Sequence, residues 1–336
     1  MSSILAVSNL SVLFGNEQDG VRAVDDVSFT VERGETLGIV GESGSGKSVT
    51  GLALMRLISR PGRVVGGSIA FGGLDLLALS EKQIRHVRGR EVSMIFQDPM
   101  TSLNPVLTIG RQITEILEIQ AGITATEARL RAVELLSMVG IPSPERRLGD
   151  YPHHFSGGMR QRVMIAIAVA CRPKLLIADE PTTALDVTIQ AQILEILKNL
   201  QQDFGMALIL ITHDLGVVAG MADRIAVMYG GRIVEEGAID PVFEDPHMPY
   251  TVGLLRSTPR LDRPDEPRLR PIRGAPAEPV GPATFCRFAP RCDLVQPICR
   301  REVPPLRPVG SAGQKAACHF AEDVPGLLRV HRGVEV

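Results

Sequence analysis

Residues 41–48 have the sequence Gly41-Glu-Ser-Gly-Ser-Gly-Lys-Ser48, and no other stretch says more about the fold of this chain. The apolar residues 37–40 before it predict a strand, and the residues from 49 onward predict a helix. Glycines let backbone N–H groups turn inward around a phosphate, Lys47 can reach the β- and γ-phosphates of a nucleotide, and the Ser48 hydroxyl can bind Mg²⁺. A glycine-rich turn without a ligand would not need this strand–loop–helix context. The candidate phosphate-site residues are Gly41, Ser43, Gly44, Ser45, Gly46, Lys47 and Ser48.

A second candidate element is Leu175-Leu-Ile-Ala-Asp179-Glu180. Four apolar residues predict a buried strand, and two carboxylates follow at its carboxyl end, where ligands bind in α/β folds. Asp179 suits the coordination shell of Mg²⁺, and Glu180 suits a base that polarises an attacking water. Alone, such a strand is often only a strand terminus. Together with the phosphate loop it predicts a site that hydrolyses a nucleotide.

The order of predicted elements indicates an α/β fold. Residues 1–95 contain short β-type runs, and residues 109–120 and 125–139 carry apolar residues at the spacing of helices. Residues 175–178 and 207–211 predict buried strands with a helix at 190–201 between them, which implies a mainly parallel sheet covered on both faces. Of the 24 prolines, 16 lie in residues 241–336, so this tail is expected to be mostly loops.

Composition limits the possible partners. The formal net charge is −2, with a pI near 6.4, which gives no electrostatic footprint for nucleic acid. The first residues lack the basic region and cleavage site of a signal peptide. The longest apolar run, residues 163–171, is about half the length of a membrane helix. A soluble chain is therefore expected, with any membrane contact made through a partner.

The stretch Phe155-Ser-Gly-Gly-Met-Arg-Gln-Arg162 resembles the signature loop of ATP-binding cassette (ABC) ATPases, with Met159 where glutamine is commoner. The resemblance implies a P-loop NTPase fold with a helical subdomain at about residues 97–165. It also implies that Ser156, Gly157 and Gly158 contact the γ-phosphate held on a partner subunit, so that a head-to-tail dimer encloses two ATP molecules. The free N–H groups at the start of the following helix suit an anion. The alternative, capping of that helix by Ser156, explains the serine but not the two glycines.

Other residues fall where the ABC family places its site residues. Gln97 resembles the glutamine that senses Mg²⁺ and links to the transporter, and Ala184-Leu-Asp186 resembles the loop that joins the two subunits. His213 resembles the switch histidine that holds the γ-phosphate and the attacking water, although an isolated histidine after a strand is more often a surface residue. Phe14 is the candidate for stacking on adenine; an aromatic side chain near a strand end more often packs in the core.

Three stretches resemble the ATPases of dipeptide and oligopeptide importers: residues 97–105, residues 151–160, and residues 247–255, which open a C-terminal extension in that family. The resemblance implies a nucleotide-binding domain at 1–240 and an extension at 241–336. It implies an ATPase at the cytoplasmic face of the membrane, energising import of peptides or a related small solute. The implied partners are two integral membrane permeases, a second, related ABC ATPase and, indirectly, an extracytoplasmic solute-binding protein. The alternative is a soluble ABC ATPase acting on nucleic acid or ribosomes.

Four of the five cysteines lie in the proline-rich tail: Cys286, Cys292, Cys299 and Cys318. This grouping suggests tetrathiolate coordination, and the absence of a C-x-x-C pair fits a zinc ribbon poorly. The family resemblance implies a structural [4Fe–4S] cluster here, which would staple a segment with little core of its own. The alternative is a set of unligated buried thiols. Cys171 lies in an apolar helix and is expected to be a core residue.

Overall fold

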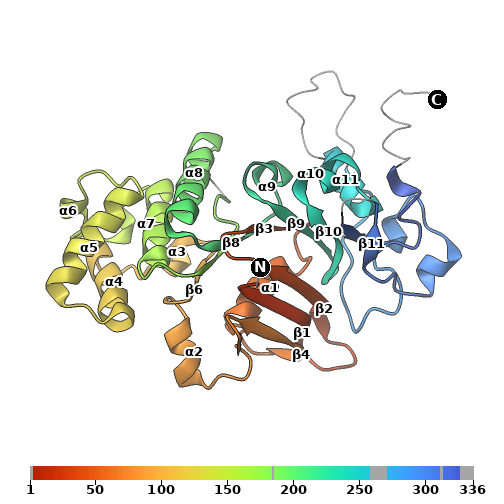
Figure 1. Ribbon diagram of the computed structural model, residues 1–336, viewed down its shortest axis with the longest axis horizontal. Helices are drawn as coiled ribbons and strands as arrows, with labels where there is room; N and C mark the ends of the chain where they lie inside the picture. The colour runs from red at the N-terminus through yellow and green to blue at the C-terminus, as the bar shows by residue number, and fades with distance from the viewer. Residues whose placement is uncertain (1–2, 184, 258–270, 311–312, 326–336) are drawn as a thin grey trace. The chain divides into compact units, whose positions relative to one another are not determined.

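The computed structural model describes residues 3–183, 185–257, 271–310 and 313–325 (Figure 1). These residues belong to two compact units. The helical unit comprises Met1–Ile4, Val31–Glu35 and Gly72–Ile211. The phosphate-loop unit comprises Leu5–Thr30, Thr36–Phe71 and Thr212–Val336. Among the residues described, no helix combines the length and the apolar character needed to cross a bilayer.

The helical unit contains three neighbouring parallel strands. They are β6 (Val92–Ile95), β7 (Leu175–Asp179) and β8 (Ala207–Thr212), with β7 between the other two. Every residue of these strands is buried, as expected of parallel strands covered on both faces. Apolar runs predicted β7 and β8, and β6 lies in the region of short β-type runs predicted for residues 1–95. A two-residue strand, β5 (Leu74–Asp75), also belongs to this unit.

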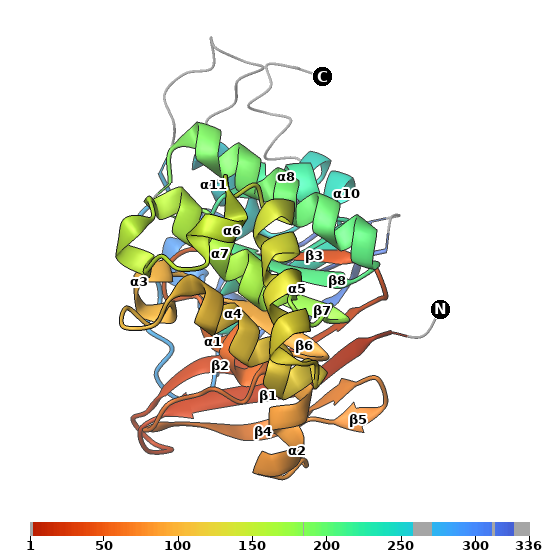
Figure 2. The ribbon, with the colours of Figure 1, turned by 90° about the vertical axis from the view of Figure 1, so that its left-hand side faces the viewer.

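The helices of this unit confirm the predicted helical region. They are α2 (Glu81–Val87), α3 (Pro99–Ser102), α4 (Ile109–Ile116), the π-helical turn η1 (Leu117–Ala121), α5 (Ala125–Met138), α6 (Pro144–Arg147), the 3₁₀ turn η2 (Pro152–His154), α7 (Gly157–Val169) and α8 (Val187–Phe204). Figure 2 shows α4, α5 and α7, which pack against one another. A capping box between Thr124 and Glu127 starts α5. The first predicted helix, 109–120, changes from α to π hydrogen bonding at Leu117.

The phosphate-loop unit contains an antiparallel sheet and a mixed sheet. The antiparallel sheet has the order β2 (Val21–Val31), β1 (Leu5–Phe14) and β4 (Gly62–Phe71). In the mixed sheet, β3 (Thr36–Val40) pairs in parallel with β9 (Arg224–Tyr229), and β9 pairs antiparallel with β10 (Arg232–Ala238). Gly230 and Gly231, both with positive φ, form the two-residue turn between β9 and β10.

Two short strands from the tail extend this sheet. Strand β12 (Gln314–Ala316) pairs with β10, and β11 (Arg307–Val309) pairs with β12. The proline count predicted mostly loops and missed this hairpin, because its pairing partner lies far away in the sequence. The remaining elements of the unit are α1 (Lys47–Leu54), α9 (Leu215–Met221), α10 (Ile239–Glu244), α11 (Pro249–Ser257) and the 3₁₀ turns η3 (Ala289–Arg291) and η4 (Pro297–Arg300).

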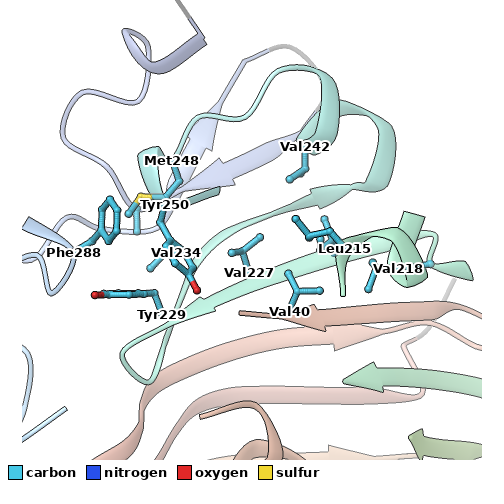
Figure 3. Close-up of a cluster of buried hydrophobic side chains, with 13 residues drawn as sticks. Val40, Leu215, Val218, Val227, Tyr229, Val234, Val242, Met248, Tyr250 and Phe288 are labelled. Atoms are coloured by element: carbon cyan, nitrogen blue, oxygen red, sulfur yellow. The ribbon is translucent and has the colours of Figure 1, made fainter. Parts of the chain in front are cut away.

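One hydrophobic core joins the tail to the strands of the phosphate-loop unit (Figure 3). Three aromatic rings of this core pack against one another: Tyr229 of β9, Tyr250 of α11 and Phe288 of the tail. Their ring centroids are 4.6–5.4 Å apart. The same core contains Val40, the last residue of β3 before the phosphate loop. A domain boundary at residue 240 stays a prediction, although residues on both sides of it share this core.

A buried carboxyl group lies on β10 beside the start of the tail. Glu235 is fully buried, and its Oε1 accepts the backbone N–H of His247 at 2.6 Å. Burial raises the pKa of Glu235 from its ordinary value of 4.5 to about 7, against the opposing effects of the neighbouring Thr251 hydroxyl and of the backbone N–H groups of His247 and Met248. Between these two pKa values the folded chain binds a proton that the unfolded chain has released.

Because of Glu235, the free energy of unfolding of the protein should fall by about 3 kcal/mol as the pH rises from about 4.5 to about 7. Glu235→Gln keeps the size and an acceptor for His247 but cannot ionise, so this part of the pH dependence should disappear. Urea unfolding of both chains between about pH 5 and about pH 8 measures the difference. Parallel stability curves for the two chains would contradict a raised pKa at Glu235.

Candidate functional site

The predicted phosphate loop lies between β3 and α1, and two of its glycines are required by close backbone contacts. Gly41 has φ +154°, and a Cβ there would lie 2.2 Å from the carbonyl oxygen of Met228. Gly46 has φ +101°, and a Cβ there would lie 2.1 Å from the carbonyl oxygen of Ala23. No side chain fits at either position. The loop is also held by the N–H of Gly231, which donates to the Ser45 carbonyl at 3.0 Å.

Lys47 is the first residue of α1 and its side chain turns back over the loop. It is 5% exposed, and its Nζ donates to the carbonyl oxygens of Gly41 at 2.7 Å and Glu42 at 3.0 Å. Ser48 follows in the first turn of the same helix. All the residues predicted for phosphate and Mg²⁺ binding from 41 to 48 therefore lie in one loop and one helical turn.

The helical unit brings together two site residues that the sequence predicted separately. Gln97 follows β6, and its Nε2 donates to Oε2 of Glu180 at 2.9 Å. Glu180 follows β7 with a left-handed backbone, φ +45°, which is costly for a residue with a side chain and is typical of functional sites. Asp179, the last residue of β7, is 5% exposed.

Thr183 is a site residue that sequence reasoning missed. Its Oγ1 donates to Oε2 of Glu180 at 2.8 Å, beside the bond from Gln97. Two donors thus fix one oxygen of the candidate base. The only sequence signal was a hydroxyl residue three positions after Glu180, and such a residue is too common to be singled out.

The signature loop has two local structural roles. The Oγ of Ser156 accepts the N–H of Met159 at 3.4 Å and so caps α7. Gly158 lies against α8, where a Cβ would be 2.7 Å from Cγ2 of Ile189. Close helix packing therefore accounts for Gly158, which capping alone did not explain, whereas Gly157 has ordinary contact distances around it.

The predicted subunit-joining loop, residues 184–186, is described only in part. Asp186 caps α8 by accepting the N–H of Ile189 at 3.0 Å. Ala184 of the predicted subunit-joining loop lies outside the described residues.

His213 and Phe14 belong to the phosphate-loop unit. His213 follows β8 directly and is exposed. Phe14 ends β1 opposite Gly62, where a Cβ would lie 2.5 Å from the ring, so the ring packs on the glycine backbone. Phe14 is half-buried, and its predicted stacking on adenine stays a prediction.

The four tail cysteines line one small cavity. Cys286, Cys292, Cys299 and Cys318 share it with apolar neighbours that include Phe288 and Phe320. Burial raises the pKa of the Cys292 thiol to about 12 and that of Cys318 to about 11, and the neighbouring cysteines act in the same direction. Within the described ranges, no three His, Cys, Asp or Glu side chains are arranged to hold a metal ion. Cys171 lies just after α7, outside this group, and is half-buried.

Comparisons with known proteins agree with this arrangement. A family profile described as ABC transporter matches residues 24–183, and one described as oligopeptide/dipeptide transporter, C-terminal region, matches residues 234–299. A dipeptide transport ATP-binding protein of Escherichia coli is 52% identical over 324 residues, which are 96% of this chain and 98% of that protein. An oligopeptide transport ATP-binding protein of Bacillus subtilis is 54% identical over 307 residues, 91% of this chain and 86% of that protein. The chain belongs to the ABC transporter ATP-binding proteins.

Solved structures of this family show the same fold. A dimeric ATP-binding cassette bound to ADP and phosphate aligns with a TM-score of 0.63 at 27% identity, covering 70% of this chain and 98% of that one. A cassette of an ABC transporter complex from Clostridium perfringens aligns with a TM-score of 0.63 at 28% identity, covering 78% of this chain and 97% of that one. The ABC protein described here is thus an ATPase, and ATP with Mg²⁺ is its expected substrate complex.

Proposed function

We propose that this ABC ATPase energises the import of di- or oligopeptides, or of a related small solute, from the cytoplasmic face of the membrane. The observation that carries the proposal is the identity of more than half over at least nine-tenths of the chain with dipeptide and oligopeptide transport ATP-binding proteins. The partners that follow are two integral membrane permeases, a second ABC ATPase and, indirectly, an extracytoplasmic solute-binding protein. The alternative, an action on nucleic acid or ribosomes, would be expected to come with an excess of basic residues, and the net charge of −2 gives no such excess.

The proposed chemistry assigns a role to each part of the site. Lys47 and the N–H groups of the phosphate loop hold the phosphates, and Ser48, Gln97 and Asp179 are the residues proposed for Mg²⁺. Glu180 accepts a proton from the attacking water, and the bonds from Gln97 and Thr183 fix the orientation of its carboxylate. His213 holds the γ-phosphate and the water. Ser156, Gly157, Gly158 and Asp186 serve the site that a partner ATPase completes.

Glu180→Gln tests this assignment. The amide can keep hydrogen bonds with Gln97 and Thr183 but cannot accept a proton, so the turnover number should fall at least about a hundredfold while ATP binding is retained. Equilibrium binding of ATP and steady-state hydrolysis measure the two effects in the assembled transporter. Glu195→Gln, at an exposed position on α8, is the matched control and should behave as the wild type. Normal turnover by Glu180→Gln would reject the assigned base.

A cavity in the helical unit is the proposed contact with the permease. It has a volume of about 300 Å³ and is lined by Ser102, Gln112, Glu115, Ile116, Ile119, Gln120 and Ile167. Ile119 is 69% exposed at this cavity, and Val106 nearby in the sequence is 75% exposed. Gln112 fixes the connection before α4, because its Nε2 donates to the carbonyl oxygens of Asn104 and Leu107, both at 3.0 Å. Both apolar and polar side chains line this cavity, and a short amphipathic helix of the permease would fit it.

Ile119→Asp should separate the ATPase from its permease. A carboxylate in place of the Ile119 side chain would lose hydration when the permease covers it and would lie near Glu115, so we expect recovery with the membrane subunits to fall at least about tenfold, while ATP binding by the purified chain is unchanged. Leu130→Asp is the control, since Leu130 is similarly exposed at 64% on α5 and does not line the cavity. Equal recovery of the two variants with the permease would contradict the proposed contact.

We also propose that the four tail cysteines hold a [4Fe–4S] cluster. The support is their position around one cavity, where burial disfavours free thiolates and ligation by iron would supply the missing positive charge. A four-iron cluster is larger than a single ion, so its thiolates stand farther apart than the ligands of one metal ion. The cluster would stabilise the tail by linking residues 286–299 to residue 318.

Anaerobic purification tests the cluster. The wild-type chain should show a broad absorption near about 400 nm together with bound iron and acid-labile sulfide. Cys292→Ser should lose much of the colour and the iron, and Cys171→Ser, outside the group, should keep both. A colourless wild-type chain without iron would reject the cluster and leave four buried thiols.

A further inference from the structure

An arginine of the tail forms an ion pair with an acidic residue inside the phosphate loop. Nη1 of Arg291 lies 2.6 Å from Oε2 of Glu42, and Nη2 lies 3.0 Å from Oε1, so the contact is bidentate. Arg291 is separated from Glu42 by 249 residues in the sequence. Both belong to the phosphate-loop unit. This geometry is the strongest type of contact between an arginine and a carboxylate.

Residues of the tail and of β9 hold the side chain of Arg291 in place. The side chain of Arg291 is only 5% exposed, and its guanidinium lies 5.7 Å from the ring centre of Tyr229 and 6.0 Å from that of Phe288. Its Nε donates to the carbonyl oxygen of Arg273 at 2.7 Å. Because these contacts already fix the guanidinium of Arg291, little rotamer freedom is lost when it forms the ion pair with Glu42.

Glu42 is an unusual neighbour for a phosphate. Its own carbonyl oxygen accepts Nζ of Lys47 at 3.0 Å, so its backbone belongs to the loop that receives the nucleotide. The Glu42 N–H donates to the hydroxyl of Tyr250, another tail residue, at 2.8 Å. A free carboxylate here would repel the anionic phosphates and attract Lys47 away from them. The guanidinium of Arg291 cancels that charge.

A second arginine of the same segment contacts the turn between β9 and β10, which is hydrogen-bonded to the phosphate loop. Arg287 donates through Nη1 to the carbonyl oxygen of Gly230, and its Nη2 lies 3.3 Å from Asp25. The next turn residue, Gly231, donates to the carbonyl of Ser45 in the phosphate loop. The segment from 286 to 292 therefore contacts the loop directly through Arg291, and Arg287 contacts the turn that is hydrogen-bonded to the loop.

We propose that Arg291 is a positioning residue of the ATPase: it neutralises Glu42 and holds the phosphate loop open to the nucleotide, so that the tail sets the affinity for ATP. This role goes beyond energising import and does not depend on the cargo, on the permease contact or on what the four cysteines hold. A residue that only anchors the tail would occupy the same place, so the test must separate charge from packing.

Removing the charge of Arg291 separates the two roles. Arg291→Gln removes the charged guanidinium that lies over Tyr229 and Phe288 but keeps a polar side chain at this position, and we expect it to bind a fluorescent ATP analogue with Mg²⁺ about tenfold more weakly than the wild type. In the Glu42→Gln background the same substitution should change the affinity by less than about twofold, because no carboxylate remains to be neutralised. The measurement is an equilibrium titration of the full chain, with thermal unfolding as a check of the fold.

Two further variants complete the design. Arg300→Ala is the matched control, since Arg300 is exposed and is likewise the immediate neighbour of a tail cysteine, and it should bind like the wild type. Arg291→Lys keeps the charge and should retain most of the affinity; if Arg291→Gln does not fold, Arg291→Met, which also removes the charge, takes its place. An unchanged affinity of Arg291→Gln, or an equal loss in the Glu42→Gln background, would overturn the proposal. Neither result would affect the assignment to peptide import, which rests on the identity with peptide transport ATP-binding proteins and not on Arg291.

Discussion

The shape of the phosphate loop depends on two backbone contacts that leave no room for side chains. Gly41 lies against the carbonyl of Met228 in β9, and Gly46 lies against the carbonyl of Ala23 in β2. Gly231 adds a hydrogen bond to Ser45 from the turn between β9 and β10. The local sequence permits a phosphate-binding loop, but strands far away in the sequence determine its position. Any element that stabilises these strands therefore also stabilises the site.

The sequence predicted those parts of the structure that depend on local pattern. The buried strands β7 and β8 have continuous apolar runs, and α5 begins at its own capping box, so each needs only nearby residues. The hairpin of β11 and β12 was missed because it forms only by pairing with β10. In the site, Gln97 and Glu180 were predicted as separate motif residues. Their direct hydrogen bond, and the second donor Thr183, depend on how β6 and β7 end side by side.

The signature loop shows why a structural and a functional explanation of one motif can both hold. Ser156 caps α7, and Gly158 allows α7 to approach Ile189 of α8. Gly158 lets the start of α7 lie close to α8, and the cap fixes the first turn of α7. An anion site at a helix start needs fixed N–H donors, so these structural roles are compatible with the proposed phosphate contact. Gly157 has no comparable packing constraint, which leaves it as the residue of this loop with the least structural reason to be glycine.

The tail is best understood as part of the phosphate-loop unit. Its Tyr250 and Phe288 are buried with Tyr229 in the core that also contains the end of β3, and burial of such rings contributes about 1.5–3 kcal/mol each. A surface ion pair usually contributes little, because two long side chains must be ordered in water. Arg291 differs, since the aromatic core and the carbonyl of Arg273 have already ordered it. An acidic residue can therefore be accommodated in an anion-binding loop because the cation that balances it is supplied, already fixed in place, by the other end of the chain.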